Sequence, residues 1–191
     1  MRASLLYLVS LATYCYIPKG YGLFIPEWEF QTLEGENITI KGTVQEVYAA
    51  LGSLNLQIAQ MNGFDLGATS DDARSGVEKR ATFPRVDCQT LEEGQTDAYN
   101  ETIDYLRGVK GKPRNSAGPR ECGRVSCSWQ SATFWCNDDT KPKELSSFGE
   151  IADGVAAIYK DCTDTELFFW FSSGGAYTSD DWSVRYQWAQ C

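Results

Sequence analysis

The stretch "CGRVSCSWQSATFWCND", residues 122–138, decides the fold of this chain. It contains one run of strand-forming residues near 123–129 and a second near 133–137, with the short polar stretch "QSA" between them. Two such runs joined by a short polar connection predict a β-hairpin. Cys122, Cys127 and Cys136 lie inside this hairpin, so we expect disulfides to stabilise it.

The elements on either side of the hairpin are predicted from hydrophobic periodicity. An opening edge strand in 81–88 and a helix in 96–109 precede it, and a loop rich in glycine and proline in 110–121 leads into it. A helix in 146–162 follows, with two closing strands in 166–191 around a Gly174-Gly175 turn. The predicted fold class is α+β, a small disulfide-stapled α/β sandwich in which two helices pack on one face of an antiparallel sheet.

Two pairs of residues have a spacing that favours the start of a helix. Thr43 and Glu46 have the spacing of a capping box at the start of an N-terminal amphipathic helix, and Ser147 and Glu150 have it in the later helix. In the N-terminal helix, the apolar positions fall on one face. They are Val47, Leu51, Leu54 and Ile58.

Residues 1–22 predict a secretory signal peptide. Arg2 is the charged start, and the apolar stretch 3–16 is too short to span a bilayer. Gly20 and Gly22 supply the small residues of a cleavage site. A buried core helix is the alternative. Secretion predicts an extracellular protein in an oxidising environment.

The cysteines that remain after this signal predict three disulfides, because an even number in a secreted chain implies pairing. Spacing alone leaves the pairing open. The six are Cys88, Cys122, Cys127, Cys136, Cys162 and Cys191.

All six follow Lys79-Arg80, the one adjacent basic pair in the sequence. The polar stretch before the pair is rich in Gly, Ser and Asp, and such exposed linkers are preferred sites of proteolysis. Residues 23–80 hold no cysteine and are too few for a core of their own. We therefore expect a kexin-type protease to cut after the pair, giving a propeptide with an amphipathic helix (23–80) and a mature cysteine-rich domain (81–191). The alternative is an intact chain whose N-terminal helix packs on the domain.

Composition narrows the function classes. The net charge is −9 and the pI about 4.5, which argues against nucleic-acid binding because phosphate contacts need surplus Lys and Arg. The chain has no histidine, which excludes Ser-His-Asp and Cys-His catalysis and histidine-ligated zinc. We expect no metal, no cofactor and no enzymatic activity.

A local cluster of basic residues is the first candidate binding site. In an acidic protein it could dock lipid headgroups, a phosphate or an acidic protein; the alternative is a solvated loop. Its members are Arg107, Lys110, Lys112, Arg114, Arg120 and Arg124.

The other candidates are weaker. Most tryptophans alternate with polar residues and are expected in the core, with Trp170 the best candidate to face outward. The pairs Asp138-Asp139 and Asp180-Asp181 could serve a glycosidase, although aspartate is common in turns. Asn37 and Asn100 begin N-glycosylation sequons.

The segments "YLRGVKGKP" (105–113), "CGRVSCSWQSATFWCNDD" (122–139) and "SFGEIADGVAAIYKDC" (147–162) together resemble small secreted cysteine-rich proteins of filamentous fungi. The resemblance covers about 88–191. It implies a candidate effector, in some members with a killer-toxin-like α/β sandwich, made as a kexin-cut precursor. It implies no catalytic residue.

The sequence thus predicts a secreted effector or toxin-like protein that acts by binding a host or competitor target. That target would be a protein, a membrane or a cell wall, and later entry into host tissue is left open. We expect a monomer with no nucleic-acid partner. A secreted carboxylate-dependent glycoside hydrolase and a carbohydrate-binding module are the alternatives.

Overall fold

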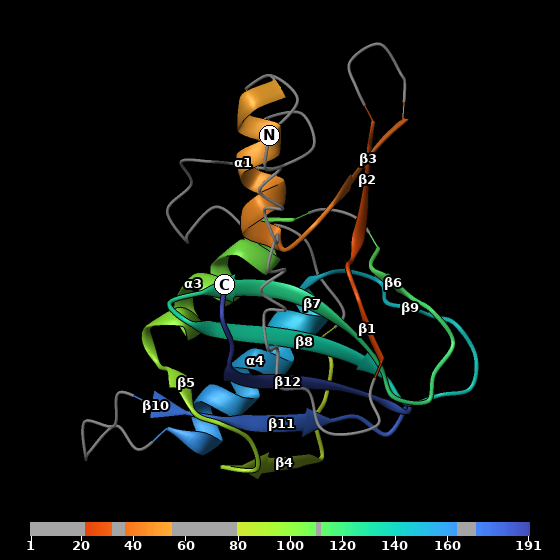
Figure 1. The fold of residues 1–191 in the computed structure, drawn as a ribbon. Coiled ribbons are helices and arrows are strands. Elements are labelled where there is room, and N and C mark those ends of the chain that lie inside the picture. The colour runs from red at the N-terminus through yellow and green to blue at the C-terminus, as the bar shows by residue number, and fades with distance from the viewer. Residues whose placement is uncertain (1–21, 32–36, 55–79, 110–111, 164–170) are drawn as a thin grey trace, which may run out of the picture.

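The computed structural model describes residues 22–31, 37–54, 80–109, 112–163 and 171–191 (Figure 1). Within these ranges, a six-stranded sheet has the order β1-β7-β8-β12-β11-β4. Its strands are β1 (Gly22–Phe24), β7 (Glu121–Ser128), β8 (Ser131–Asn137), β12 (Trp182–Trp188), β11 (Gly174–Tyr177) and β4 (Arg85–Cys88). Every neighbouring pair is antiparallel except β1 and β7, which run parallel.

The predicted hairpin is confirmed as β7 and β8, but its turn lies earlier than expected. Ser128 pairs with Ser131, so Trp129 and Gln130 form a two-residue connection in place of "QSA". Their φ angles are 51° and 55°. Positive φ at both central residues is what a type I′ turn needs, and this turn follows the right-handed twist of the two strands.

Three helices are described: α1 (Val44–Leu54), α3 (Asp97–Gly108) and α4 (Gly149–Cys162). The later two contact each other, and α4 packs on β4, β11 and β12 while α3 contacts β7. Figure 1 shows α4 behind the sheet. Ile151, Val155 and Ile158 of α4 are fully buried against it, as their helical spacing predicts. The α+β fold class is therefore confirmed.

A glutamate caps the first turn of both α1 and α4. In α4 its partner differs from the predicted one. In α1 the Thr43 N–H donates to Glu46 Oε2 at 2.6 Å, as the capping-box prediction requires. In α4 the expected partner Ser147 is replaced by Ser146, whose N–H donates to Glu150 Oε1 at 2.7 Å. The box is displaced because Gly149 begins the helix, so Glu150 lies in the first turn and reaches further back.

The six cysteines form three disulfides, which confirms the prediction and fixes the pairing. Cys88–Cys162 ties the edge strand β4 to the end of α4. Cys122–Cys136 crosses the hairpin between paired residues of β7 and β8, with the two Cα atoms 4.0 Å apart. Cys127–Cys191 ties β7 to the C-terminal residue.

The prediction of a Gly174-Gly175 turn is wrong. Both glycines lie within β11, and the chain turns between Tyr177 and Trp182. A Cβ on Gly174 would lie 2.9 Å from Ile158 Cγ2. The glycine is required because α4 lies so close to the sheet, and a glycine inside a strand often marks such an approach.

Three two-stranded ladders complete the fold. They are β2 (Glu27–Gln31) with β3 (Asn37–Lys41), β5 (Gly94–Gln95) with β10 (Phe171–Ser172), and β6 (Arg114–Asn115) with β9 (Lys143–Glu144).

Described side chains from 22–31 and 37–54 share the core of the cysteine-rich segment. Trp28, Val44, Val47 and Leu51 are at most 2% exposed and belong to the same cluster as the helices α3 and α4. Polar contacts reinforce this packing: Gln45 Nε2 donates to Ser126 Oγ at 2.7 Å, and Gln45 Oε1 accepts from the Cys127 N–H at 3.1 Å.

A segment expected to lack its own core therefore completes that of the rest of the chain. The side chains of Leu54 and Ile58 lie outside the described ones. The packing is that of the uncut chain, so cleavage after Arg80 stays a prediction.

Candidate functional site

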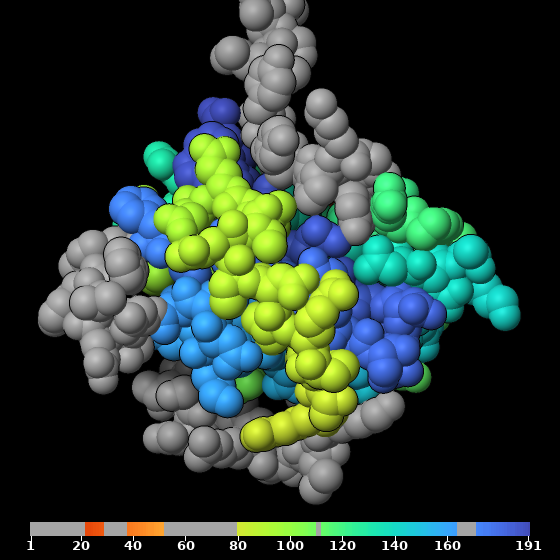
Figure 2. Space-filling model, turned by 90° about the horizontal axis from the view of Figure 1, so that it is seen from below, coloured from red at the N-terminus to blue at the C-terminus, as the bar shows by residue number. Residues whose placement is uncertain are grey.

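The expected cut site lies where a described segment begins. Arg80 is exposed, whereas Lys79 and residues 1–21 lie outside the described residues. In Figure 2 the yellow-green chain that begins at residue 80 runs over the surface, beside the blue of α4. The expected end of the signal peptide, Gly22, is the first residue of β1, so its removal would leave Leu23 and Phe24 in the strand.

Immediately after Arg80, the chain is held in place. The Ala81 N–H donates to Asp153 Oδ2 at 3.1 Å. The ring of Phe83 packs edge-on against Trp182, with the ring centroids 5.4 Å apart. Beneath it lies Gly154, where a Cβ would come within 2.9 Å of Phe83 Cζ. The segment can therefore approach α4 closely because Gly154 has no side chain.

Three of the predicted basic residues have acidic partners. Arg107 Nη2 lies 3.2 Å from Asp153 Oδ1. On the β6–β9 ladder, Glu144 lies 2.7 Å from Arg114 Nε and 3.6 Å from Lys112 Nζ. The hydrogen bond from Arg114 is the main reason that the pKa of Glu144 is lowered, and the charges of Arg114 and Lys112 lower it further.

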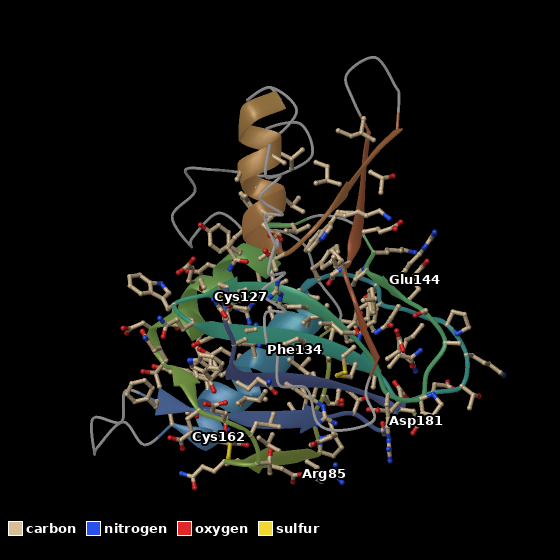
Figure 3. All side chains as sticks on the ribbon, in the orientation of Figure 1. Arg85, Cys127, Phe134, Glu144, Cys162 and Asp181 are labelled. Atoms are coloured by element: carbon tan, nitrogen blue, oxygen red, sulfur yellow. A yellow bond between two sulfur atoms is a disulfide. The ribbon has the colours of Figure 1, made fainter. Side chains whose placement is uncertain are left out.

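The other predicted basic residues lie elsewhere. Arg124 Nη1 donates to the Gln190 carbonyl at 3.3 Å, and Arg120 is exposed. Lys110 lies outside the described residues. The structure thus brings Lys112 and Arg114 together around Glu144 but places Arg107 on α3 beside Asp153 of α4. Figure 3 labels Glu144. Docking of an anionic partner stays a prediction.

The tip of the β7–β8 hairpin presents an exposed indole that sequence reasoning did not select. Trp129 is 58% exposed, and its Nε1–H donates to Glu101 Oε2 at 2.7 Å. Trp135 and Trp182 are buried, as expected for core residues. Trp170 lies outside the described residues. The missed signal was the position of Trp129 at the end of the first strand-forming run, directly before the polar connection, where a turn can begin.

One residue of each acidic pair lies where the inner strands β8 and β12 meet at one end of the sheet. The Asp138 N–H donates to the Asp181 carbonyl at 2.9 Å. Both residues line a shallow cavity of about 270 Å³ together with Arg85 and Tyr177, and Figure 3 labels Arg85 and Asp181. The Arg85 guanidinium lies 3.8 Å from the centroid of the Tyr177 ring, a cation–π contact.

These carboxylates also have local structural roles. Asp138 Oδ2 accepts from Ser183 Oγ at 3.0 Å, and Asp139 Oδ1 accepts from the Lys141 N–H at 3.3 Å. The bond of Asp139 to a backbone N–H two residues on is typical of aspartates in turns, whereas that of Asp138 joins it to β12. A catalytic role stays a prediction.

The sequons differ in what the structure describes. Asn100 is exposed on α3, while Thr102 of the same sequon is buried and its Oγ1 lies 2.9 Å from Ser126 Oγ. Asn37 begins β3, and its side chain lies outside the described ones. Glycosylation of either residue stays a prediction.

Together the fold and its sites define a small α+β protein stapled by three disulfides. No protein-family model, curated protein or solved structure matches the chain. Within the described ranges, no group of three or more His, Cys, Asp or Glu residues is arranged to hold a metal ion. Of the helices described, none combines the length and the apolar character needed to cross a membrane.

Proposed function

We propose that this chain is the precursor of a secreted fungal effector or toxin-like protein that is cut after Lys79-Arg80 and acts by binding a host or competitor target. The three disulfides are compatible with secretion. The exposed Arg80 supports processing at the dibasic pair. The resemblance of about 88–191 to small secreted cysteine-rich fungal proteins supports the effector class.

The observation that carries the binding function is the presentation of Trp129. Tryptophan is enriched among the residues that dominate binding energy at protein interfaces. Its ring is 58% exposed, yet the indole is held by the hydrogen bond to Glu101. A side chain fixed before binding loses little conformational entropy when a partner covers it.

The backbone at the hairpin tip supports the same function. A left-handed conformation is unfavourable for residues with a Cβ, yet Trp129 and Gln130 both adopt it. Such local strain persists where the surrounding structure imposes it, and it is concentrated at ligand-binding sites. Here the left-handed turn places Trp129 at the tip of the hairpin, where its indole contacts Glu101 of α3.

The test exploits this backbone conformation. Asparagine tolerates left-handed φ better than tryptophan does, so Trp129→Asn removes the indole without adding strain to the turn. We expect this variant to fold, with an unchanged circular dichroism spectrum, and to lose its effect on leaf tissue or fungal cultures. The matched control, Gln130→Asn, changes the neighbouring turn residue and should keep full activity.

Two results would contradict a role for Trp129: full activity of Trp129→Asn, or equal loss in both turn variants. Sedimentation of the wild-type protein with insoluble wall material distinguishes a cell-wall glycan from a protein or membrane target. Binding to the wall that disappears in Trp129→Asn would assign the carbohydrate-binding alternative.

A specific observation favours a second candidate, a carboxylate-dependent glycoside hydrolase. Asp138 and Asp181 line one cavity together with Arg85, although they come from separate acidic pairs. Asp181 has φ 53°, a conformation that asparagine also accepts. Asp181→Asn therefore removes the charge with little strain. The measurement is the release of reducing sugars from cell walls. Loss of this release in Asp181→Asn, with release unchanged in Asp139→Asn, would support the hydrolase.

A further inference from the structure

We propose that Asp153 is a preformed binding site for the new N-terminus created by cleavage after Arg80. The proposal rests on the processing step proposed above and adds what that step does to the molecule. In the uncut chain, Asp153 Oδ2 already accepts a hydrogen bond from the Ala81 amide at 3.1 Å.

Cleavage changes the chemistry of this contact. A water molecule hydrolyses the Arg80–Ala81 bond: the C–N bond breaks, Arg80 gains a carboxylate, and the Ala81 nitrogen becomes an amine that takes a proton at neutral pH. A neutral amide donor is thereby replaced by an ammonium group with three donors. The carboxylate of Asp153 then faces a charged donor in place of a neutral one, so the existing hydrogen bond becomes an ion pair.

The carboxylate of Asp153 can pair with the new ammonium group while it keeps its contact with Arg107. Its two oxygens face different donors, since Arg107 Nη2 contacts Oδ1 at 3.2 Å while Ala81 contacts Oδ2. The Asp153 side chain is only 16% exposed, so solvent screens the new pair less than it would screen a surface pair.

The space beside the scissile bond is acidic as well. A small cavity of about 70 Å³ is lined by Arg80, Ala81, Glu150 and Asp180, among others. The two acids favour the protonated form of the new amine over its neutral form.

The segment after the cut keeps the nitrogen in place. Phe83 is fixed between Gly154 and the ring of Trp182, and Pro84 restricts it to extended conformations. These anchors lie on the C-terminal side of the cut, so hydrolysis does not remove them. Arg80, on the other side of the cut, is exposed.

The experiment measures protection of the new amine. The secreted precursor is made in a host that lacks the dibasic protease, purified, and cut with a kexin-type protease. The cut protein is then treated with an amine-acylating reagent at neutral pH, and modification of Ala81 is followed by mass spectrometry. We expect acylation in the wild type to be about fivefold or more slower than in Asp153→Asn, because the paired ammonium group reacts only when the pair opens.

Arg107→Gln is the matched control, since it removes the other partner of Asp153 without touching the contact with Ala81. It should protect the amine as well as the wild type does. Equal acylation rates in the wild type and Asp153→Asn would overturn the proposal, as would loss of protection in Arg107→Gln. A precursor that the protease does not cut after Arg80 would instead contradict the processing step, and the proposal with it.

A second measurement covers the case in which Asp153→Asn does not fold. The acylation rate of the cut wild-type protein is then compared with that of the same protein unfolded in urea, at low and high salt. Protection that weakens as salt screens the pair supports the proposal. Native and unfolded proteins that react equally fast would overturn it.

Discussion

The indole of Trp28 stacks on the ring of Phe148, with the ring centroids 4.4 Å apart and the planes 8° from parallel. Trp28 comes before the Lys79-Arg80 pair and Phe148 lies directly before α4. Trp28 Nε1–H also donates to the Gly42 carbonyl at 2.8 Å, so the polar atom of this buried residue is satisfied. The segment expected as a propeptide is thus part of the core that the mature segment uses, and several predictions depend on this.

Shortening Leu51 tests whether α1 is part of that core. Leu51 is fully buried, so Leu51→Ala should lower the free energy of unfolding of the uncut chain by about 3 kcal/mol, through lost burial and the cavity left behind. Urea denaturation measures the loss. The control Ala49→Ser lies on the exposed side of α1 and should cost less than about 1 kcal/mol. Equal small effects would show that α1 is not packed as described.

Cleavage after Arg80 should not release the N-terminal fragment under native conditions. Its buried side chains, which include Trp28 and Leu51, each contribute about 1.5–3 kcal/mol of burial. Size-exclusion chromatography of the cut protein should therefore show both fragments in one peak, separating only in denaturant. A fragment that elutes alone in native buffer would contradict the shared core.

Removal of the disulfides should have unequal costs. The bridge Cys88–Cys162 spans 74 residues and Cys122–Cys136 spans 14. A bridge that closes a longer loop removes more conformational entropy from the unfolded chain. Cys88→Ala/Cys162→Ala should therefore lower the free energy of unfolding by about 4 kcal/mol, and Cys122→Ala/Cys136→Ala by about 3 kcal/mol. The reverse order, measured in urea, would show that native packing around the buried pair outweighs chain entropy.

Two tyrosines should make the protein sensitive to alkali. Burial raises the pKa of Tyr99 and of Tyr186 above their ordinary value, and their rings stack with centroids 3.7 Å apart. The folded state therefore keeps both phenol protons at a pH where the unfolded state has lost them. Their contribution to stability is complete below the ordinary tyrosine pKa of about 10 and is lost as the pH rises above it.

The limiting slope, reached about one unit above that pH, is a loss of about 2.7 kcal/mol per pH unit from the two phenols together. Urea denaturation measured between about pH 9 and 12 follows the onset of the loss and its limiting slope. Tyr99→Phe keeps the ring, removes one ionisation and should halve this contribution. A slope that Tyr99→Phe leaves unchanged would mean that this phenol ionises in the folded protein.

Local sequence patterns predicted most helices and strands, but not which of them pack together. The hairpin, α3, α4 and the Thr43–Glu46 box follow from periodicity and spacing, which are properties of neighbouring residues. The turn at Trp129-Gln130 was missed because its left-handed residues lack the usual glycine or asparagine. Gly174 was misassigned because a glycine in a tight helix–sheet contact has the same sequence signal as one in a turn.

Long-range relationships were beyond the reach of the sequence. An amphipathic stripe shows that α1 buries a face, but nothing in it identifies the core of the later segment as the partner. The meeting of Asp138 with Asp181, and of Ala81 with Asp153, depends on the order of the strands and on the packing of α4. The pairing of six cysteines was open for the same reason.

The central claim is that the secreted chain is cut after Arg80 and that its two parts stay together. Mass spectrometry of secreted material, first in native buffer and then in denaturant, tests it most directly. The account predicts a complex of fragments 23–80 and 81–191 that resolves in denaturant into a species beginning at Ala81 and its N-terminal partner. A single unbroken chain beginning at Leu23, with no species beginning at Ala81, would contradict it.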